Sequence, residues 1–381
     1  MNNPAASHER FDPIAIVGAG CVFAGANNPE ELWNLVHSGR DASSEVQPQR
    51  WVLHPSKAQG KTPAQPDHVH TTRGFFARIP EPDPKKYCLP KDILAKLDPG
   101  CLLALEAASQ ALGTKLGSIN PKRAGVILGH IALPTVGTCK LALQTLGRTL
   151  AQKAGMPVPP ECDGIEPSWL ARPAALPAMM ISQAYDLGGP SFTLDAACAS
   201  SFYALKLAAD ALHARKVDVM LAGGVSAPDS LYTSMGFSQL RALSPTGMSR
   251  PFDHRADGLM VGEGAGIFLL KRLSDAVRNG DEILGVIRGI GLSNDIGGGL
   301  LAPNSEGQLR AMRSAYAQAK WKPSDIQLVE CHATGTPLGD AVEFSSMREL
   351  WAGYQTREEA CVIGSVKSNV GHVLTGAGGA G

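Results

Sequence analysis

The sequence GGPSFTLDAACASS, residues 188–201, is the stretch around which the rest of the chain is organised. A Gly-Gly-Pro turn leads into residues 192–194, which read as a short strand, and residues 199–212 carry apolar side chains at helical spacing. Cys198 therefore stands between a strand and the start of a helix, where the positive end of the helix dipole favours thiolate over thiol. Although a free cysteine is most often a small buried hydrophobe, the small neighbouring side chains leave room for a substrate. We interpret Cys198 as a nucleophile.

The composition narrows the class of protein. The chain has 381 residues, with 35 Lys plus Arg and 35 Asp plus Glu, so its formal net charge is zero. The length suggests two domains or one doubled domain, and the lack of a basic stripe argues against nucleic acid as a partner. No stretch approaches the ~18 uncharged apolar residues of a membrane span, and residues 1–13 lack the order of a signal peptide.

The eight cysteines are scattered over positions 21, 88, 101, 139, 162, 198, 331 and 361. They form no C-x-x-C motif and no short-spaced cluster with histidine, which argues against a zinc site. Scattered cysteines in a chain without a signal sequence predict reduced thiols and a cytoplasmic location.

Strands and helices alternate along the chain. Near-continuous apolar runs predict strands at residues 13–18, 123–129, 192–194, 217–224, 262–270, 283–291, 326–331 and 361–366. Helical spacing predicts helices at residues 29–38, 92–111, 178–185, 199–212 and 305–319. Buried strands that alternate with helices predict parallel sheets covered on both faces. Because the order of elements starts again near residue 283, we expect a doubled α/β domain with its join near residues 275–282.

A glycine-rich segment follows the first predicted strand. Gly18 and Gly20 resemble part of a dinucleotide-binding fingerprint, but Phe23 occupies the place of the third glycine. We therefore expect a tight turn over residues 18–26 and no dinucleotide site there.

Two histidines follow predicted strands in the second half of the chain. His332 comes directly after one strand, and His372 comes a few residues after the next. Functional groups gather at the carboxyl ends of parallel strands, so we expect both histidines at one edge of a sheet. A helix beginning near His372 would keep its imidazole neutral through the helix dipole. Lys367 is either a surface charge or a partner of Glu343.

Three segments of the chain resemble a known family. GPSFTLDAACASS (189–201), ECHATGTPLGDAVE (330–343) and KSNVGHVLTGAGGAG (367–381) look like the active-site blocks of β-ketoacyl-acyl-carrier-protein synthases, in the same order. These are the condensing enzymes of fatty acid and polyketide assembly. PFDHRADGLMVGEGAG (251–266) is similar to the segment between the first two blocks, and PIAIVGAGCVFAGA (13–26) resembles the family's start. Within the family, the chain looks most like iterative synthases of polyunsaturated fatty acids.

The resemblance implies the thiolase fold, in which two similar α/β halves form five layers, α-β-α-β-α, and pair as a homodimer. The halves of this chain would be residues 11–274, with the nucleophile, and residues 282–381, with the two histidines. The sequence stops at Gly381, before the Gly-Phe-Gly-Gly turn that supplies an oxyanion N–H in this family. We therefore expect a C-terminally truncated synthase that lacks the last strands of its second half and condenses poorly. We also expect it to belong to a longer polypeptide with further synthase domains.

The resemblance also implies a β-ketoacyl synthase reaction. Cys198 would take an acyl chain from the phosphopantetheine arm of an acyl carrier protein, and its backbone N–H would form half of an oxyanion hole. His332 and His372 would promote loss of carbon dioxide from malonyl-acyl carrier protein, and the carbanion would attack the Cys198 thioester to give a 3-oxoacyl product. No cofactor would be bound. Lys367 matches the family's structural and electrostatic lysine, with Glu343 as the matching acid.

Other functions fit these residues less well. A thiolase would need a second catalytic cysteine near the C-terminus, and ketoacyl synthases that act on coenzyme A thioesters resemble a Cys-His-Asn arrangement, where this chain has His372. A serine hydrolase is excluded because the chain has no G-x-S-x-G motif. The alternative from another class is a non-catalytic partner protein that shapes a pocket for an active sister chain, but such partners lack the nucleophile that Cys198 provides.

Overall fold

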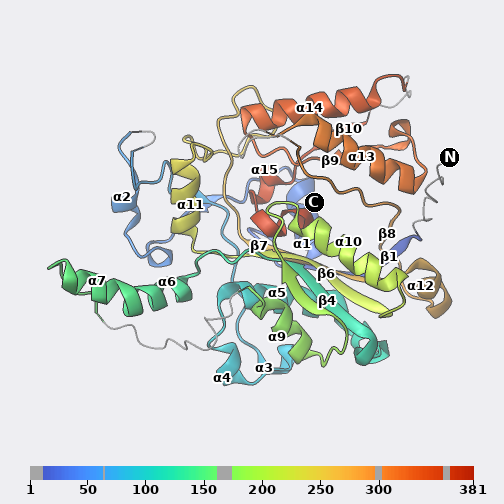
Figure 1. Ribbon diagram of the computed structural model, residues 1–381, viewed down its shortest axis with the longest axis horizontal. Coiled ribbons are helices and arrows are strands. Elements are labelled where there is room, and N and C mark those ends of the chain that lie inside the picture. Colours follow the sequence, from blue (N-terminus) through green and yellow to red (C-terminus); the bar gives the residue numbers. More distant parts are fainter. Residues whose placement is uncertain (1–11, 63–64, 161–173, 297–302, 355–360) are drawn as a thin grey trace, which may run out of the picture.

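A computed structural model describes residues 12–62, 65–160, 174–296, 303–354 and 361–381. Its central element is a six-stranded sheet in the order β5-β4-β6-β7-β1-β8, with helices packed against it (Figure 1). The strands are β1 Ile14–Phe23, β2 Ser44–Glu45, β3 Arg73–Gly74, β4 Ala124–Gly129, β5 Ser191–Leu194, β6 Val219–Ser226, β7 Gly264–Arg272, β8 Gly285–Ile287, β9 Leu328–Glu330 and β10 Val362–Gly364. The α-helices are α1 Pro29–His37, α2 Pro55–Ala58, α3 Pro84–Tyr87, α4 Lys91–Leu94, α5 Pro99–Leu112, α6 Val136–Ala142, α7 Arg148–Lys153, α9 Leu176–Ala184, α10 Ser200–His213, α11 Ser230–Gln239, α12 Leu273–Asn279, α13 Ser305–Ala319, α14 Pro337–Trp351, α15 Lys367–Val370 and α16 Ala377–Ala380. In the described part of the chain, no helix is long and apolar enough to cross a membrane.

The central sheet combines parallel and antiparallel pairs. β4 lies parallel to β5 and β6, whereas β7 is antiparallel to both β6 and β1, and β8 is antiparallel to β1. The expectation of parallel sheets alone is therefore wrong. α5 and α16 both contact β1 and β7, so these strands are buried and have the apolar composition of parallel strands. An apolar strand sequence indicates that both faces of the sheet are covered, but it does not indicate whether neighbouring strands run parallel or antiparallel.

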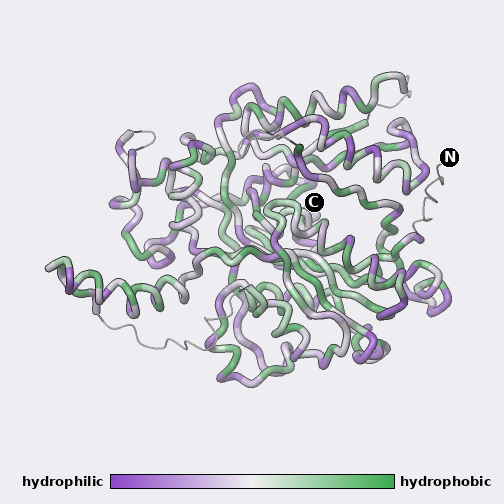
Figure 2. Tube along the Cα trace, viewed as in Figure 1, coloured by the Kyte–Doolittle hydropathy of each residue, from purple (hydrophilic) through white to green (hydrophobic). Residues whose placement is uncertain are grey.

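Alternate residues of the strands face two hydrophobic layers. On one face, α5 and α9 pack against Val126 and Leu128 of β4, and on the other face α10 packs against Ile127. Every residue of β4 and β6 is buried. Figure 2 shows the hydrophobic residues concentrated on the central strands. The elements that flank Cys198 are therefore anchored in this core.

The glycine-rich segment near the N-terminus is a strand, because β1 continues through Phe23. The expected tight turn over residues 18–26 is therefore wrong for most of its length. A Cβ atom at Gly18 would lie 2.1 Å from the carbonyl oxygen of Ala111, and one at Gly20 would lie 2.1 Å from that of Ala107. The glycines allow α5 to pack directly on the strand backbone.

The second half of the chain contributes to two sheets. β8 joins the first sheet beside β1, while β9 and β10 form a separate parallel pair with Leu328 opposite Val362. α13 and α14 pack against each other near this pair, at the top of Figure 1. Leu328 is 65% exposed and Val362 is 61% exposed. The sequence predicted that the order of strands and helices repeats near residue 283. Among the described residues, the two parts of this repeat differ in size, because the first forms most of a six-stranded sheet and the second adds one strand to it and forms a separate parallel pair.

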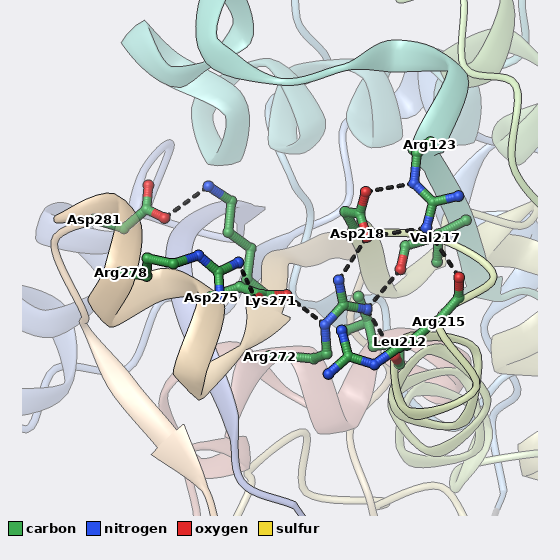
Figure 3. Close-up of polar contacts among 10 residues, drawn as sticks. All are labelled: Arg123, Leu212, Arg215, Val217, Asp218, Lys271, Arg272, Asp275, Arg278 and Asp281. Atoms are coloured by element: carbon green, nitrogen blue, oxygen red, sulfur yellow. Dashed lines mark hydrogen bonds and ion pairs between the residues drawn. The ribbon is translucent and has the colours of Figure 1, made fainter.

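A network of charged side chains closes the end of the first sheet where β6 begins and β7 ends (Figure 3). Arg272 donates to the carbonyl oxygens of Leu212 (2.7 Å) and Val217 (2.8 Å) and also pairs with Asp218. Arg123 pairs with the same carboxylate. Because the Arg272 side chain is only 6% exposed, these partners satisfy a charge that would otherwise be costly to bury. The network fixes the end of α10 that is remote from Cys198.

Candidate active site

The segment around Cys198 forms a sharp turn between β5 and α10. β5 ends at Leu194 and α10 begins at Ser200, so the predicted strand–cysteine–helix arrangement is confirmed. Ala197 has a φ angle of 51°, in the left-handed region that residues other than glycine rarely adopt. The Ser200 hydroxyl accepts a hydrogen bond from the Ala196 amide (2.8 Å) and donates one to the Ala197 carbonyl (2.6 Å). These hydrogen bonds hold the turn that places Cys198 ahead of the helix.

His372 lies against the Cys198 sulfur. Its Nε2 atom is 3.0 Å from Cys198 Sγ, and the residue is buried. The His372 amide donates to the Met260 carbonyl (2.7 Å), and the His372 carbonyl accepts from the Gly262 amide (3.0 Å). The preceding residue, Gly371, has a φ angle of 73°, and a Cβ atom there would lie 2.4 Å from a neighbouring aromatic ring. The backbone around His372 is therefore fixed, and it requires glycine beside the histidine.

His332 lies beside His372. β9 and β10 are parallel neighbours, so the loops that carry His332 and His372 leave from the same edge of this pair, as the sequence predicted. The two imidazole ring centroids are 5.4 Å apart, and the rings are nearly perpendicular at 88°. One sulfur or nitrogen atom from each of Cys198, His332 and His372 lies within 4.8 Å of the other two. Segments far apart in the sequence thus bring one thiol and two imidazoles together.

Carboxylates of α14 hold the loop that carries His332. Glu343 accepts hydrogen bonds from the amides of His332 and Ala333, each at 2.7 Å. Asp340, which is buried, accepts one from the Thr334 amide at 3.1 Å. Asp340 was not expected to take part from the sequence. The sequence feature that could have identified Asp340 is an acidic residue in the first turn of a helix that begins with proline. A carboxylate at that position can accept hydrogen bonds from nearby backbone amides.

Lys367 is buried and points to the backbone of the same loop. Its Nζ atom donates to the Cys331 carbonyl at 3.2 Å. Among the described residues no direct ion pair joins Lys367 to Glu343, although each residue influences the pKa of the other. Each of the two Glu343 oxygens accepts instead from a backbone amide.

Burial dominates the protonation of the thiol. It raises the pKa of Cys198 above its ordinary value of 9.0, although the positive charge of Lys367 acts in the opposite direction. This effect of burial acts against the thiolate that the position of Cys198 before α10 was expected to favour. Cys198 precedes the first residue of α10, and the cost of removing a thiolate from water exceeds the stabilisation from its surroundings.

Burial also keeps both imidazoles neutral. Desolvation lowers the pKa of His332 to about 4, although the residue as a whole is exposed to solvent. Burial, with smaller contributions from His332 and Lys367, lowers the pKa of His372 well below its usual range. This direction agrees with the neutral imidazole expected for His372, and burial is its largest cause.

Sequence comparisons match nearly the whole chain to one family. Residues 11–276 match the Beta-ketoacyl synthase, N-terminal domain, and residues 284–381 match the Beta-ketoacyl synthase, C-terminal domain. One of the phenolphthiocerol/phthiocerol polyketide synthase subunits of Mycobacterium tuberculosis (strain ATCC 25618 / H37Rv) is 36% identical over 97% of this chain and 19% of its own length. Another of these synthase subunits, from Mycobacterium bovis (strain ATCC BAA-935 / AF2122/97), is 34% identical over 97% of this chain and 16% of its own length. The chain thus spans about a fifth or less of the length of these relatives.

Solved structures extend the similarity to the fold. The PfaC Keto synthase-Chain length factor superposes with a TM-score of 0.88 at 37% identity, covering 97% of this chain and 41% of that one. The ketosynthase from module 6 of the bacillaene synthase from Bacillus subtilis 168 superposes with a TM-score of 0.78 at 30% identity, covering 97% and 60%. The mixed sheet, the flanking helices and the matched families agree with one another. This chain belongs to the β-ketoacyl synthase family of condensing enzymes and has the thiolase-like fold of ketosynthases.

Proposed function

We propose that this chain carries out the condensing step of polyketide or fatty acid assembly. Cys198 would accept an acyl group, which then undergoes decarboxylative condensation with malonyl-acyl carrier protein. The observation that carries the proposal is the 3.0 Å contact between Cys198 Sγ and His372 Nε2, with His332 beside it. A nucleophilic sulfur with two neutral imidazoles suits a reaction that exchanges a thioester and then stabilises an enolate. The reaction needs no cofactor of the chain itself, because both acyl groups arrive on the phosphopantetheine arm of the carrier protein.

Acyl loading begins with a protonated thiol. The S–H group of Cys198 donates to His372 Nε2, so this imidazole takes the proton as the sulfur attacks the thioester carbonyl carbon. The carbon–sulfur bond to the carrier breaks, a carbon–sulfur bond to Cys198 forms, and the proton on His372 passes to the departing carrier thiolate. The Cys198 amide donates to the oxyanion of the tetrahedral intermediate, an interaction whose removal costs about 10²–10³ in rate in other enzymes.

Condensation uses the imidazoles as hydrogen-bond donors. Once the acyl group is on the sulfur, His372 no longer accepts from the thiol and its ring exchanges to the Nε2–H tautomer. The Nε2–H of His372 and an N–H of His332 then donate to the carbonyl oxygen of the malonyl thioester while the bond to its carboxylate breaks and carbon dioxide leaves. The enolate carbon attacks the Cys198 thioester and expels the sulfur, which regains a proton from solvent, and the product is 3-oxoacyl-acyl carrier protein. Lys367 and Glu343 act as positioning residues, because they hold the loop backbone rather than the reacting atoms.

We further propose a division into two halves and a homodimer. The halves are residues 11–274, with Cys198, and residues 282–381, with the histidines. Support for the dimer comes from β5, which is the terminal strand of the sheet and carries Phe192 at 40% exposure. A free strand edge next to an exposed aromatic side chain favours pairing with a second copy. Sedimentation velocity of the purified chain tests this, and a monomer at micromolar concentration would contradict it.

We propose partner domains and a cellular location for this chain from its relatives and from its cysteines. The relatives described above are subunits of polyketide synthases, of which this chain spans a small part. We therefore expect further synthase domains and a carrier protein as partners. The seven described cysteines are all unpaired, which supports a reducing, cytoplasmic location.

The first test looks for a covalent acyl adduct on Cys198. The chain is incubated with an octanoyl-carrier protein thioester, and its intact mass is measured. Wild type should gain one octanoyl group, and Cys198→Ala should gain none. The matched control is Cys361→Ala, which should acylate like wild type. An adduct that persists in Cys198→Ala would overturn the nucleophile assignment.

The second test separates the two imidazoles. His332→Ala should retain acylation but lose release of carbon dioxide from malonyl-carrier protein. His372→Ala should lose carbon dioxide release and also acylate more slowly, because only His372 contacts the sulfur. Carbon dioxide release at the wild-type rate in either variant would remove that histidine from the condensation step.

A further inference from the structure

We propose that Cys198, His332 and His372 form a reversible binding site for a soft divalent cation, with Zn²⁺ as the favoured ion. Occupation of the site would hold the sulfur and block acyl loading. The sequence argued against a zinc site because the ligating residues are widely separated, and the fold removes that separation. Among the described residues, no other three His, Cys, Asp or Glu side chains come together in this way.

The geometry of the three side chains is close to that of a tetrahedral ion. Zn–S bonds of about 2.3 Å and Zn–N bonds of about 2.0–2.1 Å place neighbouring ligand atoms about 3.3–3.6 Å apart. Cys198 Sγ is 3.0 Å from His372 Nε2, and all three ligand atoms lie within 4.8 Å of one another. Rotamer adjustments of about an ångström would bring them to the distances of a three-ligand site with its fourth position open.

The chemistry of the donors fits the same ion. A thiolate with two imidazoles is a ligand set that favours zinc over the hard cations magnesium and calcium. Each neutral imidazole has one unprotonated nitrogen that can bind a metal, and the exposure of His332 gives an ion a path from solvent. On binding, the S–H bond of Cys198 breaks, a sulfur–metal bond forms, and the proton is released to solvent.

Two features of the site limit its affinity. Lys367 is a nearby positive charge that interacts with Cys198 and with both histidines. The Nδ1 atom of His372 is buried and has no hydrogen-bond partner among the described residues, whereas the second nitrogen of a zinc-bound histidine is normally held by an acceptor. We therefore expect a weaker, exchangeable site rather than a structural zinc centre.

Cobalt is the spectroscopic probe. Co²⁺ is titrated into the purified chain, and the near-ultraviolet absorption of a thiolate–cobalt bond is followed together with the visible bands of tetrahedral cobalt. Wild type should show both signals, and Zn²⁺ should remove them by displacing the cobalt. Cys198→Ala should lose the near-ultraviolet band, and His332→Ala should bind Co²⁺ at least about tenfold more weakly. The matched control, Cys361→Ser, should behave like wild type.

A protection experiment gives an independent readout. Saturating Zn²⁺ should slow alkylation of Cys198 by iodoacetamide at least about tenfold, because a metal-bound sulfur is not free to attack. A chelator should restore the rate. No thiolate–cobalt band in wild type, a band that persists in Cys198→Ala, or alkylation that Zn²⁺ leaves unchanged would each overturn the proposal. Neither readout needs an acyl substrate, so failure of the metal site and failure of the condensing reaction are distinguishable.

Discussion

The two sheets hold their parts of the site by different means. β4, which pairs with the strand β5 that leads to Cys198, and β6, the next strand of the sheet, are buried along their whole length. β9 and β10, which lead to His332 and His372, are three residues long and largely exposed. The histidine loops are instead held by polar contacts, in which Glu343 and Asp340 bind backbone amides and Lys367 binds a carbonyl. The turn that carries the nucleophile is therefore closed by hydrogen bonds of Ser200 beside a hydrophobic core, whereas the histidine loops depend mainly on polar contacts.

The contrast teaches what each part of the site can tolerate. Hydrophobic packing is non-directional, so β4, β6 and α10 should support the Cys198 turn through many small contacts. Hydrogen bonds from a carboxylate to a backbone amide are directional, and a buried amide left without an acceptor is costly. Single polar substitutions should therefore displace or destabilise the loop that carries His332 more than they destabilise the first sheet.

The largest expected effect compares two leucines. Leu128→Ala on β4 removes a fully buried side chain and should lower the free energy of unfolding by about 2–5 kcal/mol. Leu328→Ala on β9 is chemically the same change at a 65% exposed position and should shift it by less than about 0.5 kcal/mol. Urea unfolding of both variants measures the two changes in the free energy of unfolding. Equal losses would mean that β9 is as well packed as β4.

A smaller effect is expected for the carboxylate that holds the histidine loop. Glu343→Gln retains one acceptor oxygen and leaves one of the amides of His332 and Ala333 without an acceptor. Because these hydrogen bonds are not fully buried, the change should cost about 1 kcal/mol. Carbon dioxide release should fall more than Cys198 acylation, because the change acts on His332. The matched control is Glu349→Gln on the same helix, an exposed residue whose substitution should change stability by less than about 0.5 kcal/mol. Equal effects of the two substitutions on both reactions would contradict a positioning role.

The two regions should also differ in how fast their thiols are alkylated as the pH rises. The raised pKa of Cys198 means that thiolate is scarce at neutral pH, so its alkylation rate should rise about tenfold per pH unit up to at least pH 9. Cys331, beside His332, is buried and its pKa is raised to about 12, so it should react much more slowly over the same range. His332, with a pKa of about 4, should add no inflection between about pH 6 and 8. Peptide mapping after iodoacetamide treatment measures each site, and a plateau for Cys198 below pH 8 would contradict the protonated thiol.

The smallest effect concerns the surface of the second half. Arg313 on α13 pairs with Glu349 on α14 at 3.1 Å, with both side chains more than half exposed. Arg313→Ala should lower the free energy of unfolding by less than about 1 kcal/mol, and 1 M salt should remove most of that difference. A salt-independent loss of several kcal/mol would mean that this pair is a main support of the second half.

The local elements of the site were determined by the sequence itself. Helical spacing after Cys198, the short strand before it, and the apolar runs before His332 and His372 all predicted elements that the fold contains. The helix over residues 305–319 was predicted with its observed limits. These features follow from patterns within a few residues, where side-chain periodicity and backbone preferences act directly. The family resemblance identified the three segments that meet at the site.

Only the tertiary structure decided how these elements meet. The antiparallel placement of β7, the entry of β8 into the first sheet and the extension of β1 through its glycines depend on contacts with distant segments. The 3.0 Å contact between Cys198 and His372 joins residues that are 174 positions apart in the sequence. The protonation states were decided in the same way, because burial by distant segments raised the thiol pKa that the local helix dipole alone would have lowered. Desolvation is a property of the whole fold, and no local pattern encodes it.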